Sequence, residues 1–398
     1  SSQTQSAHTP QTPSGPPSMS ALSDVPATPS TSEQGPGTER DKDQPSKHEL
    51  GHHWSKINWK QVMNRQITAD RMFMRSGLIR KDLIVNYCSE GDHPETFLGE
   101  TLEGIESLLE EKQGGRFVCK YTDASNAYGM NFLDCSDQEK KRAGFDKLSA
   151  EMKLDNSPRV IQRYIEPKLI KDGVGEGTLH KFHLRALVIV VGDMDVFLYD
   201  ELRVLIAPEP YSSSLVSSDK ALGTLESRCV TAEGDKELSC LLHAHVTNQS
   251  FNKTHEKYVE TKHNVALHEC EELNCGDGDV ASGAEGLWDQ IRKICARTFR
   301  SLGKDKRKFM SLINTYEMFG LDFLVDEDDK AWLLEANPEP SMGMFHKTRE
   351  EIEGVRDSCL NEGVGDSWVS VYSKDTEKAM EKMKALLKEA KRVRVKEE

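Results

Sequence analysis

The sequence lacks any long run of apolar residues. Its longest purely apolar stretch, residues 186–191, contains six residues, whereas a transmembrane helix needs about 20. No basic segment followed by an apolar one stands near the N-terminus, so no secretory signal is visible. The chain begins with Ser1, which leaves room for an upstream segment. The sequence therefore predicts no membrane partner.

An excess of positive charge is also missing. The chain has 66 acidic and 52 basic residues, for a formal net charge of -14. A general nucleic-acid binder needs a basic face that neutralises phosphates, so we expect no nucleic-acid partner, although local basic patches remain possible. The nine cysteines are odd in number and widely spread, which indicates reduced thiols in a cytoplasmic protein.

Residues 1–50 contain no Phe, Trp, Tyr or Ile and hold 8 of the 15 prolines. Such a segment cannot bury enough apolar surface to offset chain entropy, so we predict a disordered Ser/Thr/Pro-rich tail. The remaining stretch of about 350 residues is long enough for a large core. At roughly 100–200 residues per domain, the whole chain allows two or three domains.

Periodicity and composition predict a mixture of strands, helices and long loops. The expected strands span residues 117–120, 160–165, 182–191, 195–199, 319–325 and 331–335. The expected helices span residues 287–302 and 374–394, and the expected surface loops span 212–238 and 252–284. Mixed in this order, these elements indicate an α+β fold with more than one lobe.

Three oxygen-bearing side chains lie on the two strands near residue 326. Asp322 stands on one strand, and Glu335 and Asn337, two residues apart, share a face at the end of the next. Hard oxygen ligands of this kind suit Mg2+. The simpler alternative is a pair of polar strand ends beside a solvated acidic turn.

Four cations accompany these carboxylates. Lys120 ends a short strand and precedes a loop of small residues, an arrangement that can hold phosphates. Alternation places Lys181, His183 and Arg185 on one face of an apolar strand, where burial requires anionic partners. Those partners are either a polyphosphate or structural carboxylates. The strand at 160–165 is a possible hinge whose backbone contacts an adenine edge.

The order of these features resembles the ATP-grasp ligases and, more narrowly, the tubulin–tyrosine ligase-like family. The strings that carry the resemblance are GLIRKDLI (77–84), RFVCKYTDASNAYGMNFL (116–133), VIQRYIEPKLI (160–170), KFHLRALVIV (181–190), VFLYDELRVLIAPEPYS (196–212), HVTNQSFNK (245–253) and MFGLDFLVDEDDKAWLLEANPEPSM (318–342). The resemblance implies an ATP-grasp-like fold whose lobes enclose a nucleotide. We expect an N-terminal lobe at 54–115, a central lobe at 116–165, a C-terminal lobe at 166–372, and a helix with a basic end at 373–398.

The resemblance also assigns roles by position. It implies ATP contacts from Lys81, Lys120, Gln162, Arg163, Ile165, Lys181, Arg185 and Asn248, with Thr247 beside them. It implies Mg2+ ligation by Asp322, Glu335 and Asn337, and catalytic roles for Lys181, His183, Arg185 and Arg203.

Two positions depart from the family pattern. His183 stands where the family usually has Asp, and Leu205 stands where it commonly has Arg. Arg203 lies two residues before Leu205 on the same strand face, so we predict that it substitutes for the missing arginine.

The implied function is an ATP-dependent ligase that adds free Tyr, Glu or Gly to a carboxylate of tubulin tails through an acyl phosphate. We expect a cytoplasmic, cytoskeleton-associated monomer that binds tubulin or microtubules. The basic segments 56–81 and 292–308 are predicted to face the acidic tails. Two alternatives stay open: a catalytically weak microtubule-binding member, suggested by His183 and Leu205, and a ligase that joins small molecules.

Overall fold

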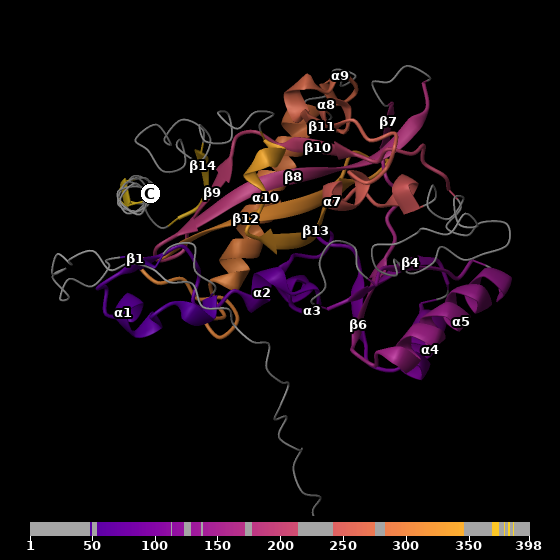
Figure 1. Cartoon of the computed structure of the whole chain (residues 1–398), viewed down its shortest axis with the longest axis horizontal. Helices are drawn as coiled ribbons and strands as arrows, with labels where there is room; N and C mark the ends of the chain where they lie inside the picture. The colour runs from indigo at the N-terminus through magenta and orange to yellow at the C-terminus, as the bar shows by residue number, and fades with distance from the viewer. Residues whose placement is uncertain are drawn as a thin grey trace, which may run out of the picture. The chain divides into compact units, whose positions relative to one another are not determined.

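The computed structural model describes residues 48–49, 54–112, 114–122, 129–136, 138–171, 177–213, 242–274, 283–345 and 368–373, and residues 378, 381, 382 and 385. Most of the strands in these residues form an eight-stranded and a four-stranded sheet (Figure 1). A short parallel pair joins β1 (His48–Glu49) to β2 (Thr68–Ala69). None of the described helices is both long enough and apolar enough to cross a membrane.

The large sheet is organised around β8 (Leu179–Val191), whose last twelve residues are all buried. β8 pairs antiparallel with β7 (Leu169–Lys171), β9 (Asp195–Tyr199), β10 (Arg203–Ile206) and β12 (Tyr316–Val325). Outside these lie β11 (Asn264–Ala266) on β10, β13 (Ala331–Pro338) on β12 and β14 (Trp368–Tyr372) on β9. The apolar run at 182–191 therefore becomes a strand covered on both faces, as its composition predicts.

Helix α10 (Ala284–Leu302) packs on β9, β13 and β14. Its buried stripe repeats at helical spacing through Leu287, Ile291, Ile294 and Phe299, which join the main core with the β8 side chains. β12 and β13 are joined by a tight turn in which the Asp326 carboxylate accepts hydrogen bonds from the Asp328 and Lys330 amides, 3.0 and 2.9 Å. That turn fixes how Asp322 and Glu335 face each other.

The small sheet has the order β3-β6-β4-β5 and a core of its own. Its strands are β3 (Thr96–Gly99), β4 (Arg116–Tyr121), β5 (Asn131–Asp134) and β6 (Arg159–Arg163). Helices α4 (Leu102–Glu111) and α5 (Gln138–Leu154) lie beside it, and both contribute to that core (Figure 1).

The described segment before β3 consists mainly of short helices. They are η1 (Trp54–Lys56), α1 (Trp59–Met63), α2 (Ser76–Ile79), α3 (Lys81–Ile84) and η2 (Val85–Tyr87). A buried carboxylate ties this segment to the large sheet: Glu317 of β12, 2% exposed, accepts a hydrogen bond from the Met72 amide (2.7 Å) and pairs with Arg75.

This pairing engages a cation of the first basic segment, residues 56–81, inside the protein. Arg75 is held by Glu317, and Arg71 contacts Asp70 and Glu339, 3.4 and 3.3 Å. Arg75 therefore stabilises the fold, and an acidic partner has to be met by other cations. In the second segment, Arg292 and Lys293 pair with Asp289, whereas Lys304, Lys306, Arg307 and Lys308 are exposed on the loop after α10.

The predicted strands and the helix at 287–302 are confirmed, with ends that shift by up to three residues. The single surface loop predicted over 252–284 is wrong. Its described part contains α8 (Glu260–His263), β11, η3 (Leu267–Glu269) and α9 (Glu271–Asn274), which follow α7 (Gln249–Asn252). β11 hydrogen bonds to β10, a pairing that local composition does not reveal. The tail at 1–50 apart from His48–Glu49, nearly all of the loop at 212–238 and most of the helix predicted at 374–394 lie outside the described residues.

Replacing Glu317 with Ala leaves Arg75 and the Met72 amide without their buried partner. We expect a loss of about 3 kcal/mol in the free energy of unfolding, because breaking a buried ion pair from one side leaves an uncompensated charge. Urea denaturation measures it, with exposed Glu327→Ala as the control, expected to change stability by less than about 0.5 kcal/mol. Equal denaturation midpoints for both variants would contradict the anchoring role of Glu317.

Candidate active site

A cleft opens among the large sheet, the small sheet and the segment before β3. Its polar lining includes Lys81 on α3, Lys120 on β4, Gln162 on β6, Lys181, His183 and Arg185 on β8, Asp322 on β12 and Glu335 on β13, with Thr247 and Asn248 from the loop before residue 249. Its apolar lining includes Val118, Met130, Phe132, Val246, Leu324 and Leu334. An apolar wall beside concentrated charge suits a ligand with a flat ring and an anionic tail.

Strand register places the acidic and basic groups in one row. Arg185 of β8 lies opposite Asp322 of β12, which lies opposite Glu335 of β13. Arg185 binds Asp322 through two nitrogens, with Nη2 2.9 Å from Oδ2. Burial opposes ionisation, but Arg185 and then His183 hold the pKa of Asp322 well below its usual range, so it is a carboxylate.

Asn337 joins the two carboxylates. Its Nδ2 lies 3.0 Å from Asp322 Oδ2 and 3.4 Å from Glu335 Oε1, and Lys81 Nζ lies 3.4 Å from Glu335 Oε2. Asn337 here turns its NH2 group toward both carboxylates, and rotation of the amide by half a turn would present Oδ1 instead. Two carboxylates and an amide oxygen are ligands that Mg2+ prefers. The residues present therefore fit a magnesium ion. Its positive charge would balance the two carboxylates, which Lys81 and Arg185 balance in this structure.

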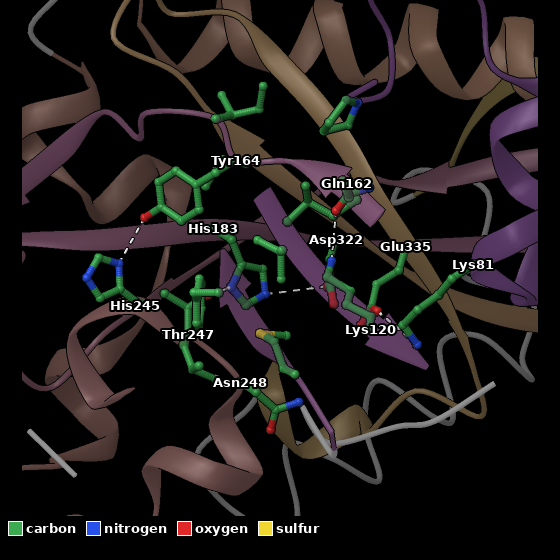
Figure 2. A pocket seen from close by; sticks show the side chains of 18 of the residues that line it. Lys81, Lys120, Gln162, Tyr164, His183, His245, Thr247, Asn248, Asp322 and Glu335 are labelled. Atoms are coloured by element: carbon green, nitrogen blue, oxygen red, sulfur yellow. Dashed lines mark hydrogen bonds and ion pairs between the residues drawn. The ribbon is translucent and has the colours of Figure 1, made fainter. Parts of the chain in front are cut away.

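His183 lies between two partners in Figure 2. Its Nδ1 is 2.6 Å from Thr247 Oγ1, and its Nε2 is 3.5 Å from Asp322 Oδ1. The histidine at this departure from the family pattern thus contacts both a predicted metal ligand and the 245–253 string.

Two lysines point into the cleft in unusual surroundings. Lys120 Nζ donates to Gln162 Oε1 (2.8 Å), and Lys181 Nζ lies 3.4 Å from the Tyr164 hydroxyl and 4.8 Å from its ring centre. Tyr164 in turn hydrogen bonds His245 Nδ1, 2.9 Å away (Figure 2). Burial, then the neighbouring cations Lys120 and Arg116, lowers the pKa of Lys181 to about 7. Burial, with Lys81 adding to it and Glu335 opposing it, lowers the pKa of Lys120 to about 8.

The cleft brings together most of the residues predicted from the sequence. Those lining it are Lys81, Lys120, Gln162, Arg163, Ile165, Lys181, His183, Arg185, Thr247, Asn248, Asp322 and Glu335, and Asn337 is bonded to two of them. Arg203 does not line it. Its guanidinium binds the Asn264 side chain and carbonyl, 3.0 and 2.8 Å, and Glu201, so its catalytic role stays a prediction.

Three residues in or next to the cleft, Tyr164, His245 and His93, were not predicted from the sequence. Tyr164 and His245 lie in the segments 160–170 and 245–253, which resemble the family, so the sequence alone could have indicated that they lie near the site. No such signal exists for His93, which precedes a proline in a segment without other candidate site residues. It contacts Gln162 but is not itself part of the cleft lining.

The family model that matches this chain is described as the tubulin-tyrosine ligase family, and it covers residues 93–376. The chain belongs to this family. It is similar to a probable tubulin–tyrosine ligase of Schizosaccharomyces pombe, 22% identical over 71% of this chain and 61% of the relative. It is also similar to the human tubulin polyglutamylase TTLL13, 25% identical over 58% of this chain and 26% of the relative. The chain thus spans about a quarter to three fifths of the length of these two relatives.

A solved structure supports the fold. The C-terminal domain of Pby1 from K. lactis, described as an ATP-grasp enzyme that interacts with the mRNA decapping enzyme Dcp2, aligns with a TM-score of 0.56. The alignment is 20% identical and covers 85% of this chain and 91% of that one. The predicted α+β, ATP-grasp-like fold and the family resemblance are therefore confirmed.

The lowered lysine pKa values predict proton uptake on ATP binding. Phosphates stabilise the ammonium form, so binding raises both pKa values, and at pH 8 we expect an uptake of about one proton. Affinity should fall as pH rises through about 7 and about 8, because neutral lysines must first be protonated. Calorimetry in two buffers of different ionisation enthalpy measures this uptake. Lys181→Met should reduce it and Lys304→Met should not; equal uptake in all three proteins would refute the assignment.

Proposed function

We propose that the chain is an ATP-dependent carboxylate–amine ligase that adds an amino acid to a carboxylate of tubulin tails. Family membership and the ATP-grasp fold support the ligase class. The observation that carries the proposal is the row Arg185–Asp322–Glu335 with Asn337, flanked by Lys81 and Lys120 in one cleft. Relatives named as a probable tubulin–tyrosine ligase and a tubulin polyglutamylase support tubulin as the acceptor. Together with a relative named as a protein polyglycylase, they leave Tyr, Glu and Gly as candidate amino acids.

The reaction requires little covalent chemistry from the protein. An acceptor carboxylate oxygen attacks the γ-phosphorus of ATP, ADP leaves, and an acyl phosphate forms. The amine of the free amino acid then attacks the acyl carbon, phosphate leaves, and an amide and a proton remain. Because charge gathers on the transferred phosphoryl group, positioned cations supply most of the catalysis.

Each charged group has a defined task in this scheme. Asp322, Glu335 and Asn337 would hold Mg2+, which would supply positive charge at the phosphate oxygens. Lys81, Lys120 and Lys181 contribute positive charge at the phosphates, and Arg185 keeps Asp322 ionised and oriented. The reaction also requires the site to exclude water, which would otherwise hydrolyse the acyl phosphate.

Recruitment of an acidic tail needs a local basic surface, since the whole chain is acidic. Arg75 is used by the fold, so the candidates among the described residues are the exposed cations of the two basic segments, Lys56, Lys60, Arg65, Lys304, Lys306, Arg307 and Lys308. The proposed location is the cytoplasm, in association with microtubules. A different protein acceptor is the second candidate, supported by the description of Pby1 as a partner of a decapping enzyme.

Glu335→Gln tests the proposal by removing one charge from the metal site while keeping its shape. We expect tubulin-dependent ADP release to fall about 100-fold or more, with an unchanged melting temperature. Exposed Glu327→Gln is the matched control. Incubation with tubulin and labelled Tyr, Glu or Gly, read by mass spectrometry of the tails, identifies the amino acid. ATP turnover in Glu335→Gln equal to that of the control would rule out the metal assignment, and unlabelled tails with all three amino acids would rule out tubulin as the acceptor.

A further inference from the structure

The segment from Asp92 to Thr96 connects the two sheets next to the cleft. On one side, the Asp92 carboxylate binds Arg297 of α10 (2.7 Å from Nε), and its carbonyl accepts from the Leu333 amide of β13, 2.8 Å. On the other side, Thr96 begins β3 and lies opposite Gln162 of β6. His93, only 7% exposed, is thereby fixed at the junction of both sheets.

The His93 ring has one well-defined tautomer. Its Nδ1 lies 2.8 Å from the Pro94 carbonyl oxygen, which can only accept, so Nδ1 carries the proton. Burial lowers the pKa of His93 to about 4, against the opposing effect of the Pro94 and Leu334 carbonyls and with the Lys120 charge adding to it, so the ring is neutral at physiological pH. Nε2 is therefore an acceptor.

That acceptor sets the orientation of the Gln162 amide. Gln162 Nε2 lies 3.5 Å from His93 Nε2 and 3.3 Å from Thr96 Oγ1, while Oε1 accepts from Lys120 Nζ at 2.8 Å. Rotating the amide by half a turn would place its oxygen against the His93 lone pair and its NH2 group against the Lys120 ammonium. Both contacts are repulsive, so one orientation is strongly favoured.

We propose that His93 is a positioning residue for the ATP phosphates, acting through the Gln162 amide on the Lys120 ammonium. The inference rests on the proposed function, because it takes the cleft to bind ATP. It adds to that function a residue outside the cleft lining and a reason for the Gln162 side chain.

The consequence for Lys120 follows from its other neighbours. Its flexible side chain also feels the attraction of Glu335 and Asp322, two of the proposed metal ligands. Without an oriented Gln162 oxygen, the ammonium is drawn toward those carboxylates. It then leaves the phosphate position and competes for a metal ligand.

Substitutions at His93 separate this role from simple packing. His93→Asn keeps a donor for the Pro94 carbonyl but has no acceptor at the Nε2 position, whereas His93→Gln can place an oxygen there. We expect His93→Asn to weaken ATP binding about 5- to 10-fold, the value of one hydrogen bond, and His93→Gln to restore most of it. Adenosine, which lacks phosphates, should bind all three proteins within about twofold.

A double-mutant cycle with Gln162→Leu completes the test. Calorimetry on the full chain measures ATP and adenosine affinities, and thermal unfolding verifies that each variant is folded. If His93 acts through Gln162, His93→Asn has no further effect on ATP affinity in the Gln162→Leu background. An equal loss for ATP and adenosine, or an undiminished effect in that background, overturns the inference. Failure of the wild-type chain to bind ATP overturns the proposed function itself.

Discussion

The ion pair between Arg185 and Asp322 is the interaction on which the site depends. Both side chains are buried on neighbouring central strands, where an isolated charge is strongly disfavoured. The pair lets an apolar strand carry charges at the base of the cleft, and Asn337 and His183 extend it on either side. Because these charges balance one another, the fold can keep the charged groups of the proposed phosphate and metal site in place.

The charged and polar groups of the cleft come from both sheets. Lys120 and Gln162 come from the small sheet, while Asp322 and Glu335 come from the large one. The arrangement of the cleft therefore depends on the position of one sheet relative to the other. Asp92 and His93 form that link within a few residues, through Arg297, the Leu333 amide and the Gln162 side chain. Movement of one sheet against the other would therefore change the position of Lys120 relative to Asp322 and Glu335.

The sequence predicted which residues line the cleft better than it predicted the surrounding structure. Alternation along one strand was enough to place Lys181, His183 and Arg185 on a common face, because the strand period is two. It could not show that Arg75 would meet Glu317, 242 positions later, or that β11 would pair with β10. Those contacts depend on tertiary packing, so the first basic segment looked like a surface and the 252–284 segment looked like a loop. His93 was missed for the same reason, since its role exists only across the junction.

Register also connects the two departures from the family pattern. His183 and Leu205 lie directly opposite each other on β8 and β10, so the usual Asp and Arg would be cross-strand neighbours of opposite charge. Replacing both together removes one negative and one positive charge and leaves the balance of the cleft intact. Leu205 is buried, and His183 has turned to Thr247 and Asp322 instead. Arg203, two pairs further along and opposite Arg185, is held by Asn264 and Glu201, and its substitution for the missing arginine stays a prediction. The two changes thus replace one cross-strand pair, an Asp and an Arg, with a histidine and a leucine. That exchange leaves Lys120, Glu335 and Asn337 in place, so under the proposed function we expect it to affect the choice of amino acid or acceptor more than the affinity for ATP.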